Sequence, residues 1–295
     1  MADLTISGSI EGPSRWLTGV ARGGPRLWFG GALVGILFLI ALLAPLLAPH
    51  DPIEQDLLSA QLPPAWIQGG EPAYPLGTDS LGRCVLSRLM FAARTAVAVA
   101  LIAASLAAVI GIAFGLIAGM FGGWIDQGVS RLIDVWMAFP PVLLSIVLAA
   151  VIGAGLTSVI AAIVVVDWTR FARVVRAETM VQLQRDYAAA ARVLGLSRGQ
   201  ILRLEILPNL VPLIVTLLAV EMGIAILVEV ILSFVGISVA GDTPTWGGMI
   251  VEGRQIIYQS PWIMTLPIVS VILSVIGFNL LGDGLRAALD PVQRR

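Results

Sequence analysis

Six stretches of the sequence are apolar for long enough to cross a lipid bilayer, and this repetition limits the possible folds more than any other feature. A membrane-spanning helix needs about 20 predominantly apolar residues. Backbone N–H and C=O groups cannot remain unpaired in lipid, so such stretches must be helices. We therefore predict an all-α, polytopic membrane protein with six transmembrane helices. The predicted spans are residues 27–48, 96–120, 132–152, 156–177, 208–235 and 263–281.

The composition agrees with a membrane protein and excludes several other classes. Only 13% of the residues are charged, against about 25% in a soluble domain, and the net charge of −1 gives no field that attracts nucleic acid. All 18 basic residues are arginine, so the phosphate-binding G-x-x-x-x-G-K-[ST] motif cannot occur. A single cysteine, Cys84, and a single histidine, His50, leave no disulfide framework or multi-histidine metal site. We expect no catalytic residue, no metal site and no cofactor bound by this chain.

Glycine and proline predict the shapes of the second and third spans. Glycines recur every four residues from Gly111 to Gly119, a pattern that allows close contact between helices. Pro140 and Pro141 lie near the start of the third span and remove backbone hydrogen bonds, so we expect a kink there. Residues 121–131 are predicted to form a short turn between these two spans.

Arginine is unevenly distributed between the two sides of the membrane. With six spans and the N-terminus inside, 14 arginines fall on inner segments and 4 on outer segments. Because cytoplasmic loops carry the excess of basic residues, we predict that both termini and residues 178–208 are cytoplasmic. This orientation requires that the first apolar run is a span. It is longer than the 7–15 residues of a signal-peptide core, and we interpret it as uncleaved.

Residues 187–209 form a polar, arginine-bearing interruption between the fourth and fifth spans. The first part is rich in alanine, the best helix former, and Gly195 favours a helix end. Ser197 can cap a second helix that starts at Arg198, and Pro208 suits the first turn of the next span. We predict a rigid elbow that serves as a docking surface. The alternative is an ordinary helical hairpin at the membrane surface.

Three carboxylates lie within the predicted spans. Glu221 and Glu229 are eight residues apart and share one helix face, and Asp167 is placed to pair with Arg170 or Arg173. Ionisable groups at membrane depth are costly and usually functional. They could line a polar pathway or bond neighbouring helices. We favour helix packing for Glu229 and leave the role of Glu221 open.

Five motifs, in order along the chain, resemble the C-type permease subunits of dipeptide, oligopeptide and nickel ABC importers. They lie in the outer interval before the second span, in the elbow, in the segment before the sixth span (two motifs), and in the C-terminal tail. The chain departs from the family at Ala189, where glutamate is frequent, at Glu205, where histidine is frequent, and at Cys84, where aspartate is usual. We interpret Cys84 as a small buried hydrophobe. The principal matching residues are Pro75, Leu76, Gly77, Thr78, Asp79, Gly82, Arg83, Ser87, Arg88, Ala190, Ala191, Gly195, Ile201, Leu207, Pro208, Asn209, Thr243, Pro244, Trp246, Gly247, Glu252, Gly253, Arg254, Pro261, Trp262, Asn279, Gly282, Asp283, Arg286, Asp290 and Pro291.

This resemblance implies a fold, an assembly and a function. The fold is the permease fold of type I ABC importers, in the bacterial inner membrane. A second, B-type permease completes the translocation pathway for peptides or a related small solute, and a periplasmic binding protein delivers the cargo. Two ATPase subunits bind ATP and Mg, so this chain is a non-catalytic subunit. The residues implied in coupling to the ATPases are Tyr187, Ala190, Ala191, Gly195, Ile201, Leu207 and Pro208.

On this interpretation the chain has five parts. They are a cytoplasmic tail (1–26), a first transmembrane helix (27–48), a periplasmic loop that contains a short amphipathic helix (49–95), a five-helix permease core with a cytoplasmic coupling loop at 178–208 (96–285), and a cytoplasmic C-terminal tail (286–295).

Two other classes of function remain as alternatives. A proton-coupled secondary transporter would use Asp167, Glu221 and Glu229 and would need no ATPase; an inverted repeat would favour it, and none is visible. A membrane-embedded enzyme or scaffold would need a polar cluster at one depth, and these carboxylates are few and scattered. The residues do not specify the solute, which could be a dipeptide, an oligopeptide, a nickel chelate or a glutathione-like molecule.

Overall fold

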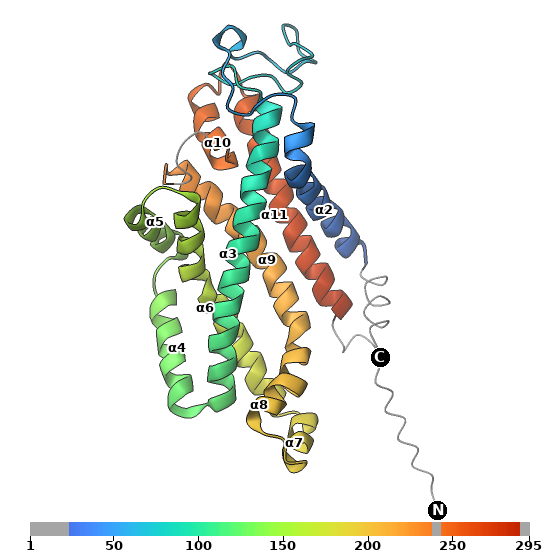
Figure 1. Ribbon diagram of the computed structural model, residues 1–295, viewed down its shortest axis with the longest axis vertical. Helices are drawn as coiled ribbons and strands as arrows, with labels where there is room; N and C mark the ends of the chain where they lie inside the picture. The colour runs from blue at the N-terminus through green and yellow to red at the C-terminus, as the bar shows by residue number, and fades with distance from the viewer. Residues whose placement is uncertain (1–23, 238–242, 290–295) are drawn as a thin grey trace, which may run out of the picture.

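The protein is an all-helical bundle with a long outer loop at one end and two short helices at the other (Figure 1). The computed structural model describes residues 24–237 and 243–289, and within these ranges the only β-type pairing is an isolated bridge between Thr78 and Cys84. The predicted fold class is confirmed. Most of the predicted N-terminal tail, and Asp290 and Pro291 of the last motif, lie outside the described residues.

The long helices cover the ranges of the predicted spans, but they do not confirm the predicted number of six. Within the described residues, four segments are long and apolar enough to cross a membrane: α2, α3, α11 and the continuous stretch Arg198–Phe234 that contains α9. Helices α4 and α5 meet the same criterion only together, as a pair bent by 85°. Helix α6 has 28 residues, but charged residues in its second half keep it outside the criterion. The bounds are α2 Gly24–Leu47, α3 Val85–Phe121, α4 Gly123–Met137, α5 Pro141–Ile152, α6 Leu156–Leu183, α9 Leu207–Phe234 and α11 Trp262–Leu289.

The shorter elements lie at the two ends of the bundle (Figure 1). A 3₁₀ turn, η1, occurs in the outer loop, and α10 packs against α9 and α11 near the same end. Helices α7 and α8 form the opposite end, where a π-helical segment, η2, leads into α9. Their bounds are η1 Leu57–Ser59, α7 Asp186–Val193, α8 Arg198–Ile201, η2 Leu202–Ile206 and α10 Trp246–Gln255.

Three local predictions differ from the structure. The turn predicted at residues 121–131 is wrong, because Gly122 alone separates α3 from α4, and left-handed φ values of 63° and 56° at Gly122 and Gly123 reverse the chain. The kink predicted at the proline pair is a complete break, since Pro141 starts a new helix. The predicted short amphipathic helix is continuous with α3, whose sequence contains no glycine or proline before Gly111.

Close contact between α3 and α6 organises the middle of the bundle. A Cβ atom added at Gly111 would lie 2.3 Å from the carbonyl oxygen of Trp168, and one at Gly115 would lie 2.8 Å from that of Ala172. The two backbones therefore meet along the predicted glycine face, which confirms it. Because lipid tails are as apolar as the side chains, such close van der Waals contact is a main source of helix association in membranes.

This contact makes a specific prediction for stability. Gly111→Ala should lower the stability of the detergent-solubilised protein by about 1–3 kcal/mol, because the new methyl group overlaps a backbone oxygen. Gly35→Ala is the matched control: Gly35 lies in α2 with no atom within 4 Å of the added Cβ, and alanine gains about 1 kcal/mol in helix propensity. Thermal unfolding midpoints in the same detergent compare the two variants. Equal midpoints would contradict the close approach of α3 and α6.

Candidate functional site

The elbow at residues 187–209 begins with α7, which ends at a glycine. Gly195 has a left-handed φ of 82°. The N–H of Leu196 donates to the carbonyl of Ala191 at 3.1 Å, and that of Gly195 donates to the carbonyl of Arg192 at 3.0 Å. This is a Schellman motif, in which a glycine outside the helix closes its last turn. The predicted helix end at Gly195 is therefore confirmed.

The second half of the elbow is also as predicted. Ser197 and Gln200 form a capping box at the start of α8: the Gln200 N–H donates to the Ser197 hydroxyl oxygen, and the Ser197 N–H donates to the Gln200 side chain at 2.8 Å. Pro208 lies in the first turn of α9, but α8, η2 and α9 form one continuous helical stretch, so the position without an N–H follows the π-helical segment η2 and not a break in the chain. The turn at Gly195 and the start of α8 are therefore built from short-range signals in the sequence.

The predicted coupling residues divide into buried and exposed groups. Ala191 and Ile201 are buried in a small apolar core that attaches the elbow to α6 and α9. Ala190, Gly195 and Pro208 are exposed, and Leu207 is half-buried. The first group holds the elbow in place, and the second lies on its surface. The fully buried or nearly buried members of the core are Val175, Ala188, Ala191, Ile201, Ile206 and Leu210.

Tyr187 joins the elbow to the end of α6. Its hydroxyl donates to the side-chain oxygen of Gln182, and its ring packs against the elbow core. Burial raises the pKa of the Tyr187 hydroxyl, and this effect outweighs the positive charge of nearby Arg185, which lowers the pKa. Tyr187 therefore stays neutral at physiological pH and keeps its role as a hydrogen-bond donor.

Two apolar side chains at the tip of the elbow were missed by the sequence reasoning. Val193 and Leu194 are 89% and 78% exposed. They are the last residue of α7 and the residue after it, and α7 lies at the end of the bundle opposite the outer loop (Figure 1). Their exposure leaves these two side chains available for contact with another molecule. The feature of the sequence that could have indicated them is their position just before Gly195 in the polar, arginine-bearing segment.

The structure brings Asp167 and Glu221 together with one arginine. Asp167 is 2% and Glu221 is 1% exposed. Arg170 lies between them, with Nε 3.7 Å from the Asp167 carboxylate and Nη1 3.5 Å from the Glu221 carboxylate. The cluster therefore joins α6 to α9. Of the two arginines predicted as partners of Asp167, Arg170 is the one that pairs with it; Arg173 contacts Asp134 instead.

Glu229 belongs to a different network. The Ser233 hydroxyl donates to the Glu229 carboxylate at 2.6 Å, and the Thr245 hydroxyl lies 3.2 Å from that of Ser233. Thr245 in turn caps α10. These contacts tie α9 to α10, and they are those of a helix-packing residue. Glu221 and Glu229 do not form one site.

Four charged residues from two of the sequence motifs meet near the outer end. Arg83 lies 2.8 Å from both Asp79 and Glu252, and Arg88 lies 3.0 Å from the second Glu252 oxygen while also contacting Asp79. Asp79 is 1% exposed. This outer ion-pair cluster fastens the outer loop and the start of α3 to α10. Cys84 is buried beside it and makes no disulfide.

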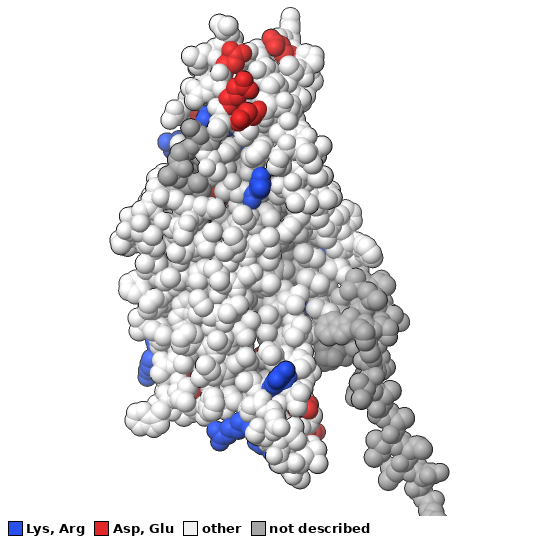
Figure 2. Space-filling view, viewed as in Figure 1, with Lys and Arg blue, Asp and Glu red and all other residues white. Residues whose placement is uncertain are grey.

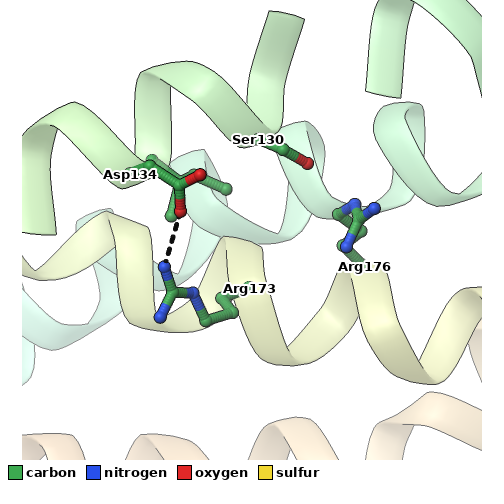
Figure 3. A pocket seen from close by; sticks show the side chains of 5 residues that line it. Ser130, Asp134, Arg173 and Arg176 are labelled. Atoms are coloured by element: carbon green, nitrogen blue, oxygen red, sulfur yellow. Dashed lines mark hydrogen bonds and ion pairs between the residues drawn. The ribbon is translucent and has the colours of Figure 1, made fainter. Parts of the chain in front are cut away.

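A hollow between α4 and α6 carries further charges (Figure 3). Its volume is about 370 Å³. Asp134 accepts from Arg173 at 2.9 Å, and Arg176 donates to Asp126 at 2.7 Å. Sequence reasoning did not find these pairs, because Asp126 was placed in a turn rather than on a helix. The lining residues are Ser130, Ile133, Asp134, Arg173 and Arg176.

None of these groups has the geometry of a metal centre. Within residues 24–237 and 243–289, no three histidine, cysteine, aspartate or glutamate side chains are grouped closely enough to hold a metal ion. Several of the charged side chains form ion pairs between helices.

Comparison with known proteins identifies two family models. Residues 111–295 match the model described as binding-protein-dependent transport system inner membrane component. Residues 25–64 match the model described as the N-terminal transmembrane domain of oligopeptide transport permease C. Together they include α2, part of the outer loop, and all of the bundle from the middle of α3 onwards.

Individual relatives extend over most of the chain. The dipeptide transport system permease protein of Haemophilus influenzae is 42% identical over 88% of this chain and 90% of its own length. The corresponding protein of Escherichia coli K12 is 41% identical over 88% of this chain and 89% of its own length. A glutathione transport system permease protein of Pectobacterium atrosepticum is 36% identical over 88% and 85%, respectively.

The helical bundle and these matches define a multi-pass membrane transport protein. The chain belongs to the family of binding-protein-dependent transport system inner membrane components. It is a non-catalytic permease subunit of an ABC importer, a class that works with a partner permease, ATPases and a binding protein. The family relationship gives no support to the proton-coupled alternative.

The outer ion-pair cluster predicts a stability effect. Glu252→Gln should lower the stability of the detergent-solubilised protein by about 2 kcal/mol, because Arg83 and Arg88 lose a charged hydrogen-bond partner while remaining buried. Glu71→Gln, an exposed change of the same chemistry in the outer loop, should have an effect within about 0.5 kcal/mol. Thermal unfolding of both variants checks the difference. A loss for Glu71→Gln as large as that for Glu252→Gln would contradict this role of the cluster.

Proposed function

We propose that this chain forms the translocation pathway of a peptide importer together with a B-type permease. The observation that carries this proposal is its similarity, along 88% of the chain, to permease proteins named for dipeptide transport. A glutathione transport permease is also similar, and glutathione is itself a small peptide. Cargo of this class would be delivered by a periplasmic substrate-binding protein.

In the proposed orientation both termini and the elbow are cytoplasmic, in a bacterial inner membrane. The excess of arginine on the inner segments supports it. The loop between α2 and α3 then faces the periplasm, and acidic side chains are visible at this end (Figure 2). ATP and Mg would bind to two partner ATPase subunits, since this chain has no lysine for a phosphate-binding loop.

We infer that the tip of the elbow is the contact with an ATPase subunit. Val193 and Leu194 would enter an apolar hollow of the ATPase, and the exposed Ala189 and Ala190 would allow close approach of its surface. Ala189 stands where the resembling permeases often have glutamate, so one polar contact would be replaced by apolar contact here.

The connections of the elbow suggest how movement reaches the pathway. Helix α6 runs directly into the elbow, and α9 runs directly out of it through η2. The apolar core under the elbow includes Val175 of α6 and Leu210 of α9. When ATP closes the ATPases, movement of the elbow would tilt α6 and α9 and turn the cavity from inward-facing to outward-facing. Hydrolysis would reset it.

Co-purification tests the proposed assembly. The tagged chain would be extracted from its native membrane in mild detergent, and the accompanying proteins identified by mass spectrometry. We expect a second permease and an ATPase with its own phosphate-binding loop. A homo-oligomer without an ATPase would overturn the proposal.

The exposed tip of the elbow generates a prediction for binding. Val193→Ser with Leu194→Ser should reduce the co-purified ATPase at least about tenfold, because burying each aliphatic side chain is worth about 1.5–3 kcal/mol. The matched control is Leu57→Ser with Leu58→Ser, two leucines of similar exposure in the outer loop. Quantitative mass spectrometry compares the subunit ratios. Equal ATPase recovery from both double variants would exclude the elbow tip as the contact.

Gly195 generates a prediction for transport. Gly195→Val should reduce uptake in reconstituted vesicles, since a β-branched residue at a φ of 82° costs roughly 1–2 kcal/mol and distorts the end of α7. The ATPases should still bind ATP. Gly199→Val is the control, because both glycines have open space around an added Cβ and only Gly195 has a left-handed backbone. Unchanged uptake in Gly195→Val would remove the elbow conformation from the mechanism.

A further inference from the structure

The hollow between α4 and α6 presents both signs of charge at its accessible surface (Figure 3). The side chains of Asp134 and Arg173 are 58% and 50% exposed, and they form a single contact of 2.9 Å. Those of Asp126 and Arg176 are only 16% and 27% exposed. The first pair is therefore accessible to a ligand, and the second supports the wall of the hollow.

The charges of the hollow balance. Arg176 of the lining is already paired with Asp126, so the accessible charges are the Asp134 carboxylate and the Arg173 guanidinium. A ligand that carries only one charge would leave one of these two side chains without a partner. A zwitterion instead supplies an ammonium group for the carboxylate and a carboxylate for the guanidinium. Charged hydrogen bonds of this kind are roughly twice as strong as neutral ones.

The size and lining of the hollow suit a small peptide. Its volume of about 370 Å³ lies within the usual range of about 300–1,000 Å³ for sites that bind small molecules. Ile133 is 2% exposed and packs against Trp168 and Ala172, which gives the hollow a firm apolar base. The Ser130 hydroxyl adds a neutral polar group to the lining.

The position of the hollow also favours contact with cargo. Arg173 and Arg176 belong to α6, the helix that continues into the elbow. A ligand in the hollow would therefore bind to a helix that we propose moves during the transport cycle.

We propose that the hollow between α4 and α6 is a cargo site that recognises small zwitterions, and this inference rests on the proposed peptide-importer function. Asp134 accepts from the ammonium terminus, and Arg173 donates to the carboxylate terminus, while Arg176 stays paired with Asp126. On binding, the contact between Asp134 and Arg173 is exchanged for two contacts with the ligand. The ligand must therefore have both a free ammonium terminus and a free carboxylate terminus.

The first test uses the assembled importer in vesicles and compares a dipeptide with its N-acetyl and C-amide forms. Asp134→Asn should reduce uptake of the dipeptide about tenfold, with little effect on the N-acetyl form. Arg173→Gln should reduce uptake of the dipeptide about tenfold, with little effect on the C-amide form. Each rate is divided by the wild-type rate for the same compound, so that discrimination by the binding protein cancels.

In the expected result each variant slows the dipeptide but spares the compound that lacks the matching charge. This crossed pattern distinguishes recognition of the ligand from a structural defect. Asp126→Asn removes a charge from the same helix but from the better-buried pair, and it should lower all three rates by the same factor. An equal loss for all compounds in Asp134→Asn and Arg173→Gln would show a structural role only and overturn the inference.

A second test measures occupancy directly and does not depend on transport of the modified peptides. Ser130→Cys places a thiol in the hollow, and the native Cys84 is 1% exposed. In the importer reconstituted in phosphatidylcholine and phosphatidylglycerol, the dipeptide should slow maleimide labelling several-fold, and its N-acetyl amide should not. Protection only when phosphatidylethanolamine is present would assign the hollow to a lipid headgroup, and no protection would mean an empty hollow. Either result would overturn the inference.

The proposed importer function and the proposed cargo site can fail separately. If the wild-type importer lacks an ATPase or takes up no peptide, the proposed function fails. If the wild type imports the dipeptide but shows neither the crossed pattern nor protection, only the cargo site fails.

Discussion

The contact between the backbones of α3 and α6 is the constraint on which the other interactions depend. It exists because the glycines of α3 allow the carbonyl groups of α6 to approach, as at Gly111 and Trp168. Once that face of α6 is fixed, the remaining faces are fixed as well. Asp167 and Arg170 are directed toward α9, and Arg173 and Arg176 toward α4. A rotation of α6 would separate all of these pairs.

Ion pairs then join α4, α9 and α10 to this central pair of helices. The outer ion-pair cluster connects α10 to α3 through Glu252 and Arg88, and Arg170 connects α6 to α9. Each pair is costly to bury, and removal of one partner leaves the other uncompensated. These ion pairs determine which helices are neighbours. Apolar contact in lipid specifies this only weakly. A transport protein benefits from this, because its helices must move without exchanging partners.

Local sequence signals were sufficient wherever a structure depends on neighbouring residues. Gly195 and Ser197 specify the turn of the elbow and the start of α8 through local hydrogen bonds. The signals failed where two effects compete over a longer distance. The turn predicted at residues 121–131 was wrong because an amphipathic helix that pairs with α6 reads as polar and irregular when α6 is not considered. The predicted number of six spans is not confirmed for a related reason: charged residues keep α6 outside the criterion for a span, and two of these residues pair with other helices.

By itself, the sequence determined that this is an all-helical membrane protein, where most of its helices begin and end, and which family of importers it resembles. These properties depend on hydrophobic length, on caps and on short motifs, all of which act over a few residues. Only the tertiary structure decided that Asp79 and Glu252 share the same arginines, that Asp167 and Glu221 share Arg170, and that α4 and α6 enclose a charged hollow. These groups are far apart along the chain, and helix rotation and packing bring them together.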